Sequence, residues 1–522
     1  MIDFDGLRGL ADIPRMQAKA RPDAPALWFE GETTSFAELD RRSNKIANAL
    51  IAADVQPGDR VAYLGKNLDR YYEIMFGATK ARAALAALNN RLAPAELQFV
   101  ASDAEAKILF VAEDFYETAA SIAEDLPALK GIIAIDGGHS SWPAYEEVRD
   151  KFDDNDPNLA PLPGDDVIQL YTSGTTGLPK GVMLTNANYL AYMRQSTGLD
   201  WARYAPGDRV MNAMPLFHVA GVNLGVLAIS QGAETLILRD IVPSEILRLI
   251  ESHRIVHAFW VPAVILMLTQ EPSAAETDFS SLRNVFYGAS PIAETLLLEA
   301  QDLMGCDFTQ LYGLTETVGG GTFLPSAAHN PAWGKLRSCG VPYPGAIIRC
   351  MDGDGMPVPT GDVGEVAIKA DFVMKGYWNR PEATETAIRD GFFYTGDAGY
   401  FDEDGFLYIH DRVKDMIISG GENIYPAEVE NAVFSHPDVA DVAVIGVPDK
   451  KWGETVKAIV VATAGTSPSE ADIITWARER IAAFKCPKSV DFTDALPRNP
   501  SGKILRKDLR EPYWKDNDRR VG

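Results

Sequence analysis

The sequence predicts an α/β protein with a large N-terminal domain of helix-covered parallel sheets plus a small β subdomain, followed by a small, mobile α/β C-terminal domain. Three observations predict this fold class. Short apolar runs alternate with helical patterns in residues 60–135 and again in residues 209–287. Beyond residue 345 the pattern changes to short strands joined by Asp-Gly turns. The chain, at 522 residues, also exceeds the size at which a single hydrophobic core keeps growing.

The first set of elements lies between residues 60 and 135. We expect strands at 60–64, 84–88, 107–111 and 131–135, with helices at 69–83 and 94–102 between them. The second helix begins at Pro94, and proline suits the first turn of a helix. This alternation is typical of a parallel sheet whose two faces are covered by helices.

A second set and a separate C-terminal unit follow. The expected strands of the second set are 209–213, 235–238, 257–260 and 284–287. After residue 411 we expect a compact unit with helices at 426–434 and 469–483 and strands at 439–445 and 456–461. These patterns place the N-terminal domain at residues 1–411 and the C-terminal domain at residues 412–522.

Composition excludes several classes of protein. The formal net charge is −24, from 49 basic and 73 acidic residues, which argues against nucleic-acid binding. The four cysteines are scattered, so neither a disulfide framework nor a zinc site is expected, and a reducing compartment fits. We expect no signal peptide and no membrane-spanning segment, hence a cytoplasmic protein. Peripheral membrane contact and the choice between monomer and homodimer stay open.

The most informative motif is Tyr171-Thr-Ser-Gly-Thr-Thr-Gly-Leu-Pro-Lys180-Gly181, directly after the apolar run 167–171. Its glycines let backbone N–H groups turn toward one point, while the hydroxyls and Lys180 add donors and a mobile charge. Such a loop after a strand indicates a polyphosphate site. It is not a Walker A loop, because Pro179 precedes the lysine and Gly181 follows it. A flexible polar surface loop is the alternative interpretation.

Two further motifs point to a nucleotide. Gln310-Leu-Tyr-Gly-Leu-Thr-Glu316 offers the ring of Tyr312 for stacking on a purine, Thr315 as a donor to an α-phosphate oxygen, and Glu316 as an oxygen ligand for Mg²⁺. In Tyr394-Thr-Gly-Asp397, a carboxylate after a glycine turn can accept hydrogen bonds from both ribose hydroxyls. Each motif also has an ordinary structural interpretation, a helix start for the first and a turn for the second.

The last two motifs lie where the small domain begins and ends. The segment from Asp411 to Glu428 contains Arg412, which can bind ribose oxygens, and Gly420-Gly421, a stretch of backbone that a thin ligand can approach closely. A charged linker followed by a turn and a helix is the alternative. Pro497-Arg-Asn-Pro-Ser-Gly-Lys503-Ile-Leu-Arg holds one lysine in a loop rich in proline and glycine. A basic tail is the alternative for this segment.

Together the five motifs resemble the signatures of the adenylate-forming superfamily: acyl-CoA synthetases, luciferases and nonribosomal adenylation domains. The resemblance spans roughly residues 20–510. Through Tyr377-Trp-Asn-Arg-Pro-Glu-Ala-Thr, Asp449-Lys-Lys-Trp-Gly-Glu and the Lys503 motif, it is closest to bacterial fatty-acid–CoA ligases. It implies an AMP-forming acyl-CoA synthetase that uses ATP, Mg²⁺ and coenzyme A. Carboxylate attacks the α-phosphate of ATP to give acyl-adenylate and pyrophosphate, and the coenzyme A thiol then displaces AMP.

The resemblance also implies roles for individual residues. It assigns catalysis to Lys503, Thr315, Glu316 and His218, with Glu316 also binding Mg²⁺. Lys414 corresponds to the hinge between the two reaction steps, and the coenzyme A tunnel corresponds to Ser419, Gly420, Gly421 and Glu422. The residues expected to bind ATP are Thr172, Ser173, Gly174, Thr175, Thr176, Gly177, Lys180, Gly288, Ala289, Ser290, Gln310, Leu311, Tyr312, Gly313, Thr315, Asp397, Arg412 and Lys503.

The acid is expected to bind between the central motifs, in a pocket lined by His218, Val219, Trp260, Tyr287, Gly313, Val318 and Gly319. His218 argues against an amino acid, because amino-acid-adenylating relatives usually carry Asp at this place. Glycine at 313, where acetyl-CoA synthetases carry tryptophan, favours a medium or long apolar acyl chain. An aryl, cinnamyl or sterol-fragment acid flanked by Trp260 and Tyr287 is the second interpretation. A catalytically silent ATP-binding scaffold and luciferase-like oxygenation are further ones.

Overall fold

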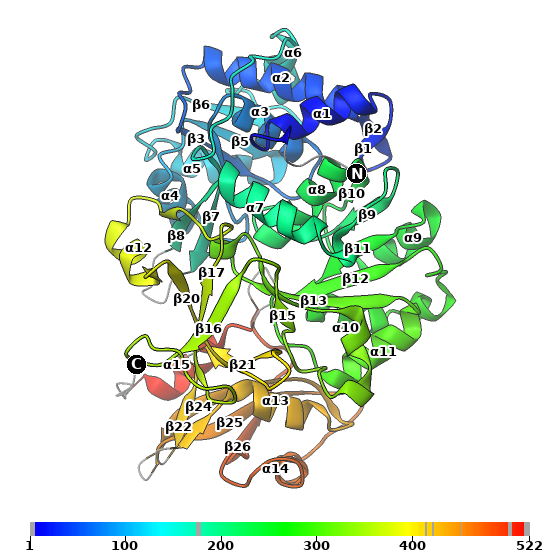
Figure 1. Ribbon diagram of the computed structural model, residues 1–522, viewed down its shortest axis with the longest axis vertical. Helices are drawn as coiled ribbons and strands as arrows, with labels where there is room; N and C mark the ends of the chain where they lie inside the picture. Colours follow the sequence, from blue (N-terminus) through cyan, green and yellow to red (C-terminus); the bar gives the residue numbers. More distant parts are fainter. Residues whose placement is uncertain are drawn as a thin grey trace.

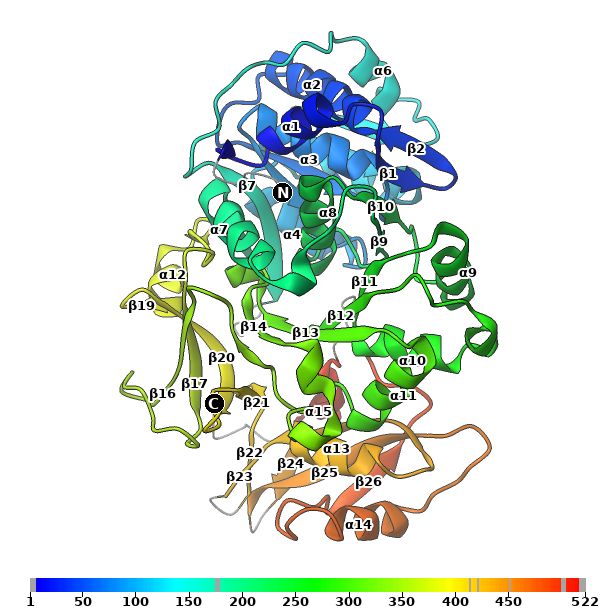
Figure 2. The same cartoon turned by 45° about the vertical axis from the view of Figure 1, so that its right-hand side comes forward.

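The computed structural model describes residues 6–173, 179–412, 415–419, 422–449, 452–498 and 504–515. Within these residues the strands form four sheets. Figures 1 and 2 show the C-terminal residues at one end of the long axis of the molecule and the first 135 residues at the other. One large hydrophobic core runs through both sheets of the larger part, a second and smaller core there includes Leu64, Leu109 and Ile122, and the C-terminal part has cores of its own.

The first large sheet has the order β18-β8-β7-β4-β3-β5-β6. Its central strands pair in parallel, whereas β7 and β8 form an antiparallel hairpin that pairs as far as Ser173 and Pro179. Its strands are β3 (Arg60–Leu64), β4 (Ala84–Ala87), β5 (Ile108–Ala112), β6 (Gly131–Ile135), β7 (Asp166–Ser173), β8 (Pro179–Thr185) and β18 (Gly376–Tyr377). Helices in this part of the chain are α2 (Phe36–Ala52), α3 (Arg70–Lys80), α4 (Pro94–Asp103), α5 (Tyr116–Ala123), α6 (Tyr145–Asp150) and α7 (Asn186–Thr197).

The second large sheet has the order β15-β14-β13-β12-β11-β9-β10-β1-β2 and is parallel from β13 to β1. Its strands are β1 (Pro25–Phe29), β2 (Glu32–Ser35), β9 (Arg209–Asn212), β10 (Glu234–Ile237), β11 (His257–Trp260), β12 (Asn284–Gly288), β13 (Asp307–Gly313), β14 (Gly321–Leu324) and β15 (Val341–Pro342). Helices in this part are α1 (Asp12–Ala20), α8 (Val219–Gln231), α9 (Pro243–His253), α10 (Pro262–Gln270) and α11 (Glu294–Met304).

Both large sheets have strands that are buried along their whole length, such as β3 and β11. Strands of this kind need helices on both faces, because neither face can meet water. The strand–helix alternation in the sequence therefore gives the helix-covered parallel sheets that it predicts. The expected fold class is confirmed.

The β subdomain and the C-terminal unit complete the fold. The subdomain is an antiparallel sheet of β16 (Ile347–Met351), β17 (Gly364–Lys369), β19 (Ile388–Arg389), β20 (Phe392–Phe401) and β21 (Leu407–Arg412), beside α12 (Pro381–Ala387). The C-terminal unit contains β22 (Ile417–Ser419), β23 (Glu422–Ile424), β24 (Val439–Asp449), β25 (Gly453–Ala462) and β26 (Ser489–Phe492), with α13 (Pro426–Phe434), α14 (Glu470–Arg478) and α15 (Arg506–Trp514). The boundary expected at residues 411–412 falls at the end of β21 and stays a prediction.

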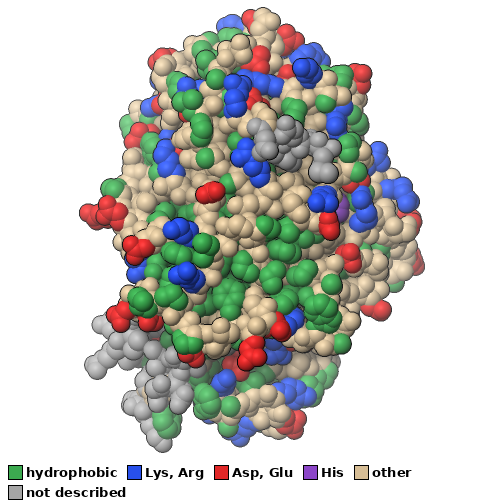
Figure 3. Space-filling model, in the orientation of Figure 1, with side chains coloured by type: hydrophobic (Ala, Val, Ile, Leu, Met, Phe, Trp, Pro, Cys, Tyr) green, Lys and Arg blue, Asp and Glu red, His purple; other side chains and the backbone are tan. Residues whose placement is uncertain are grey.

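The surface combines charged areas with one more apolar region. In Figure 3 hydrophobic side chains gather across the middle of the face, at the level where Figure 1 draws β15–β17, with charged side chains of both signs around them. No helix among the described residues is long and apolar enough to cross a membrane. Peripheral membrane contact stays an open prediction.

Candidate functional site

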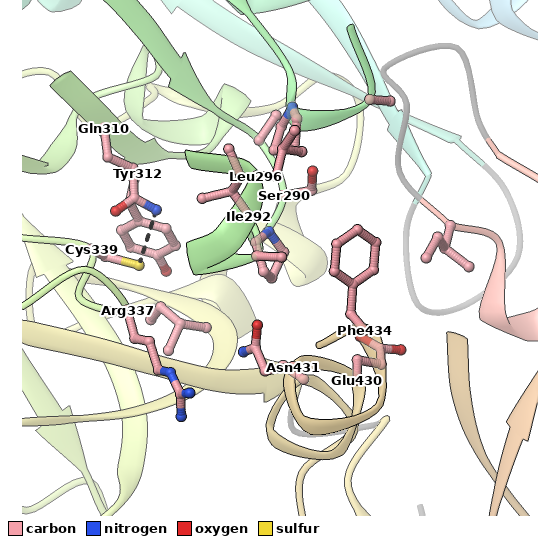
Figure 4. A pocket seen from close by; sticks show the side chains of 18 of the residues that line it. Ser290, Ile292, Leu296, Gln310, Tyr312, Arg337, Cys339, Glu430, Asn431 and Phe434 are labelled. Carbon is pink, nitrogen blue, oxygen red and sulfur yellow. Dashed lines mark hydrogen bonds between the residues drawn. The ribbon is translucent and has the colours of Figure 1, made fainter. Parts of the chain in front are cut away.

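A cavity of about 430 Å³ lies between the large domain and the C-terminal unit. Figure 4 shows Gln310 and Tyr312 of β13, with Arg337 and Cys339 from the segment before β15, on one side, residues of α13 on another, and Ser290, Ile292 and Leu296 between them. The large domain contributes Pro262, Ala263, Leu266, Ala289, Ser290, Pro291, Ile292, Ala293, Leu296, Gln310, Leu311, Tyr312, Gly313, Leu314, Leu336, Arg337, Cys339, Asp397, Tyr400, Tyr408 and Ile409. The C-terminal unit contributes Ala427, Glu428, Glu430, Asn431, Phe434, Asp441, Val442, Arg498, Ile504 and Arg506.

The structure joins the second and third sequence motifs at one wall of this cavity. The Tyr312 hydroxyl donates to Asp397 Oδ2 at 2.8 Å, and Asp397 lies opposite Arg412 in the β20–β21 ladder. Burial, reinforced by the Asp397 carboxylate, holds the pKa of Tyr312 well above its usual range, so its hydroxyl stays a donor. Gln310 lies beside them with its Nε2 4.0 Å from Cys339 Sγ. Its Oε1 is buried without a partner among the described residues, so it is an acceptor able to bind a ligand N–H.

Backbone geometry explains why small residues stand at the strand ends here. Gly288 lies opposite Leu311 in the β12–β13 ladder, and a Cβ at Gly288 would overlap the Leu311 carbonyl. The next residue, Ala289, has φ +67°, a left-handed conformation that alanine rarely adopts. Such strain at the carboxyl end of parallel strands is typical of ligand sites.

A second group of side chains lies at the β7–β8 hairpin. Glu316, in the short 3₁₀ turn Thr315–Thr317, is buried, and its Oε1 accepts from Thr172 Oγ1 at 3.2 Å and from the Tyr377 hydroxyl at 3.0 Å. The Lys180 ammonium lies 5.0 Å from the centre of the Tyr377 ring. The first two motifs therefore meet. Tyr377 joins them, although no role was predicted for it. Its position follows from β18, which pairs with β8 in the folded sheet.

Paired charges form the C-terminal side of the cavity. Arg506 Nη2 donates to both oxygens of Glu430, at 2.9 and 2.8 Å, and Arg498 Nη2 donates to Asp441 Oδ2 at 2.6 Å. Arg498 and Ile504, which both line the cavity, come just before and just after residues 499–503. Lys503 itself lies outside the described residues, as do Gly174, Thr175, Thr176, Gly177, Lys414, Gly420 and Gly421.

Two of the expected coenzyme A residues lie in the β22–β23 hairpin. Ser419 and Glu422 pair across it, and Ser419 is not among the described residues that line the cavity. Thr315 is half-buried and also stands outside that lining. Their assignments stay predictions. Besides Tyr377, the sequence analysis assigned no role to several residues that line the cavity, such as Arg337, Glu430 and Arg498. Arg498 belongs to the quoted Lys503 motif, while the other two carry no motif.

A second, smaller cavity of about 90 Å³ shares Ala289, Leu311 and Gly313 with the first. It is lined by Tyr192, Trp201, Tyr204, Val219, Ala220, Asn223, Leu224, Leu227, Phe259, Phe286, Ala289, Leu311, Gly313 and Gly319. Of the residues expected around the acid, Val219, Gly313 and Gly319 line it. Val318 does not, but its carbonyl accepts from Asn223 Nδ2 at 2.6 Å.

The expectation that Trp260 and Tyr287 flank the acid is wrong for this cavity. Phe259 and Phe286 line it instead, one residue earlier in each strand. Successive side chains of a strand point to opposite faces, so Trp260 and Tyr287 occupy the other face of the sheet. There the Tyr287 hydroxyl lies 3.0 Å from Nε2 of His329, whose Nδ1 lies 3.0 Å from the Pro325 carbonyl oxygen.

His218 lines neither cavity. It is the residue before α8, its ring lies 4.6 Å from that of Phe217, and its Nε2 is buried without a partner among the described residues. Burial, helped by the positive charge of Arg91, lowers the pKa of His218 to about 4. The imidazole is therefore neutral near pH 7 and carries a single N–H. A contact between His218 and the carboxylate stays a prediction.

Burial also lowers the pKa of His257 and of His329 to about 4. Between pH 6.5 and 4 the unfolded chain binds protons at these sites that the folded chain does not, so stability is present above pH 6.5 and is lost as the pH falls. Each group contributes up to about 1.4 kcal/mol per pH unit. We expect the free energy of unfolding in urea to drop steeply from pH 7 to pH 5, and His257→Phe to make that drop shallower. If the free energy of unfolding of His257→Phe fell as steeply between pH 7 and pH 5 as that of the wild type, this account would be contradicted.

A glycine is needed at position 313 for backbone packing, whereas the sequence analysis expected it to leave room for a long acyl chain. A Cβ there would overlap the Gly319 carbonyl group and lie 2.8 Å from the Gly320 carbonyl oxygen. The glycine thus permits a close approach of two backbone segments, and the structure does not show it as an open wall for a long chain.

We therefore expect Gly313→Ala to displace the 319–320 segment, at a cost of about 1–3 kcal/mol, and to lower kcat/KM for every acid rather than for long acids alone. Gly131→Ala is the matched control, because its Cβ would meet only Ile108 Cδ1 at 3.7 Å. Selective loss of long acids in Gly313→Ala would restore the length-filter interpretation.

Comparisons with known proteins agree with this geometry. Residues 14–378 match the AMP-binding enzyme family, and residues 428–503 match the AMP-binding enzyme C-terminal domain. The fatty acid–[acyl-carrier-protein] ligase ScoC of Streptomyces coeruleorubidus is 41% identical over 520 residues, 99% of this chain and 98% of the relative. A feruloyl-CoA synthase of an Amycolatopsis species is 40% identical over 508 residues, 97% of this chain and 99% of the relative.

A solved structure shows the same fold. ATP-bound MatB from Rhodopseudomonas palustris superposes with a TM-score of 0.87 at 31% identity, covering 97% of this chain and 99% of that one. The family match extends over more than half of the chain, and it includes the Tyr312, Glu316 and Lys180 motifs that the structure brings together. The chain therefore belongs to the AMP-binding enzyme family, and the relatives that it matches over nearly its whole length include acyl-CoA ligases.

Proposed function

We propose that the protein activates a carboxylic acid with ATP and transfers the acyl group to the thiol of coenzyme A. One observation carries this proposal. Tyr312 and Asp397 of the large domain face the same cavity as Arg498 and Ile504, the described residues on either side of the Lys503 segment. A nucleotide bound by the first pair would have its reacting phosphate within reach of residues from the C-terminal unit. We infer that this arrangement is the one for the first step, formation of the acyl-adenylate.

The charge distribution fits that step. Attack of a carboxylate on ATP brings two anions together, so catalysis depends mainly on neutralisation and in-line positioning. Lys180, next to Tyr377 and Glu316, would hold the β- and γ-phosphates, and Lys503 would meet the oxygens where charge develops. Asp397 and Tyr312 would hold the nucleoside.

Glu316 is the proposed Mg²⁺ ligand. Its buried carboxylate already accepts two hydroxyl hydrogen bonds, which orient it. Among the described residues, no cluster of three or more His, Cys, Asp or Glu could hold a metal ion by itself. This fits Mg²⁺, which usually takes one or two carboxylates and completes its shell with water and substrate phosphates. When bound, the ion would neutralise phosphate charge.

The second step needs a different face of the C-terminal unit. Once the adenylate exists, Lys503 is no longer needed, and we propose that rotation about Lys414 presents the segment 419–422 to the thiol. The thiolate then attacks the acyl carbon, the bond from that carbon to the AMP oxygen breaks, and AMP leaves.

The identity of the acid is a separate question from the type of reaction. The two similar enzymes are named for a fatty acid and for a feruloyl group, so similarity alone does not choose. The sequence favours a medium or long acyl chain, with an aryl or cinnamyl acid as the alternative. The cavity beyond Gly313 is about 90 Å³, smaller than the apolar cavity of about 150 Å³ that holds benzene. We propose that this small volume favours the compact alternative over a long chain.

The test is product analysis with ATP, Mg²⁺, coenzyme A and a panel of acids. We expect AMP, pyrophosphate and acyl-CoA in equal amounts, and an accumulating acyl-adenylate when coenzyme A is left out. Formation of ADP, or of AMP at a rate that does not depend on the acid, would refute the proposed function.

A further inference from the structure

Five of the fourteen residues that line the small cavity are aromatic. Phe259 and Phe286 are register partners in the parallel β11–β12 pair, so they stand side by side on one face of the sheet. Trp201 packs edge-on against Phe286 with ring centres 5.5 Å apart, and Tyr192 and Tyr204 complete the aromatic part of the wall. Aromatic walls favour flat rings, which gain offset-stacked and edge-to-face contacts that a saturated chain cannot make.

One polar group in this wall has a fixed orientation. Asn223 is 5% exposed, and its Nδ2 donates to the Val318 carbonyl oxygen at 2.6 Å. Because a carbonyl only accepts, that bond settles which end of the amide is nitrogen and leaves Oδ1 as an acceptor. Oδ1 is buried and has no partner among the described residues.

A second residue of the same wall carries an unpaired donor. The indole Nε1 of Trp201 is also buried without a partner among the described residues. Buried polar atoms are normally satisfied, so an unpaired acceptor and an unpaired donor on two residues that line one cavity would both be satisfied by a ligand group that can give and take a hydrogen bond. A hydroxyl group does this.

We propose that the acid is an aromatic carboxylate whose ring carries a hydroxyl or N–H group, with the ring among Phe259, Phe286 and Trp201 and the polar substituent at Asn223. This inference rests on the proposed function, because it assumes that the acid enters the small cavity. The ring enters through the neck that Ala289, Leu311 and Gly313 share between the two cavities, and its carboxylate stays in the larger one.

The size of the cavity is consistent with a ring but not with a long chain. An apolar cavity of about 150 Å³ holds benzene, and here a cavity of about 90 Å³ adjoins the larger one at the three residues that line both. A ring that lies partly in the small cavity and partly at these three residues needs less volume than benzene enclosed entirely. A chain of eight or more carbons needs more volume than the small cavity offers.

The experiment measures kcat/KM for acid-dependent pyrophosphate release. The acids are two matched pairs, benzoate with 4-hydroxybenzoate and cinnamate with 4-hydroxycinnamate, together with octanoate and palmitate. We expect ring acids to exceed both aliphatic acids, and the better hydroxylated acid to exceed its parent roughly 5- to 150-fold, since the parent leaves Asn223 Oδ1 unpaired.

Variants locate the effect. Asn223→Leu should bring the ratio of kcat/KM for the hydroxylated acid to that for its parent close to one, and Leu224→Met, in the same wall, should keep the wild-type ratio. If Asn223→Leu does not fold, the wild-type pairs decide alone. Preference for octanoate or palmitate, no gain from the hydroxyl group, or a gain that persists in Asn223→Leu would overturn the inference. No release with any acid would overturn the proposed function and this inference with it, whereas release with aliphatic acids alone would overturn only the inference.

Discussion

Replacing Lys503 by alanine is expected to slow acyl-adenylate formation by a factor of about 10²–10³, the usual cost of removing one preorganised donor from developing charge. The reason is that attack of the carboxylate concentrates negative charge on the α-phosphate oxygens. Thioester formation from supplied acyl-adenylate should change little, because the proposed rotation about Lys414 takes the Lys503 segment away from the reacting groups before that step. Both half-reactions are measured separately, the first by pyrophosphate release and the second by loss of synthetic acyl-adenylate in the presence of coenzyme A.

Lys507→Ala is the matched control for Lys503→Ala. Lys507 lies four residues further on and is exposed in α15. Its replacement by alanine therefore removes the same charge from the same segment, at a side chain that does not line the cavity. It should leave both half-reactions close to wild type. Equal losses in the two half-reactions of Lys503→Ala would remove this lysine from the first step.

The second large effect is expected for Lys414→Pro. Lys414 follows β21, whose last residue, Arg412, lies opposite Asp397 in the sheet. A rotation at residue 414 would therefore move the C-terminal unit and leave the cavity wall that contains Tyr312 and Asp397 in place. Proline fixes φ, and an incompatible backbone conformation costs about 1–3 kcal/mol, or roughly 5- to 150-fold in population. Thioester formation should slow by this factor while acyl-adenylate synthesis continues.

Lys414→Ala separates backbone from side chain. It removes the ammonium group but leaves φ free, so both half-reactions should proceed at nearly the wild-type rate. Normal acyl-CoA synthesis by Lys414→Pro would place the hinge elsewhere. Equal slowing by proline and alanine would show that the side chain matters rather than the rotation.

The sequence predicted the elements of the fold best where burial is uniform. The strands 60–64, 131–135 and 257–260 have the predicted bounds, because short apolar runs between turns leave little choice of length. The strand expected at 439–445 runs instead to Asp449, through Gly446 and Pro448, which usually interrupt strands. Pairing with β25 as far as Gly453 overrides that local preference.

The same uniform burial explains why Trp260 and Tyr287 were expected where Phe259 and Phe286 line the small cavity. Both β11 and β12 are buried along their whole length, so the sequence has no polar alternation to show which face meets the cavity. Trp260 and Tyr287 were therefore as plausible as Phe259 and Phe286. The cavity wall formed by Tyr312 and Asp397 was easier to predict, because each of these residues stands in a sequence motif. Their hydrogen bond joins residues 85 positions apart, and only the folded sheets bring them together.

Isotope transfer tests the central claim most directly. The protein is incubated with ATP, Mg²⁺, coenzyme A and an accepted acid labelled with ¹⁸O in its carboxylate, and the products are analysed by mass spectrometry. Attack of the acid on the α-phosphate predicts one ¹⁸O atom in AMP, the other in the acyl-CoA carbonyl, and none in pyrophosphate. Label in inorganic phosphate together with ADP would show attack on the γ-phosphate, and unlabelled AMP would show that the acid never joined the nucleotide. Either result would contradict the adenylate route.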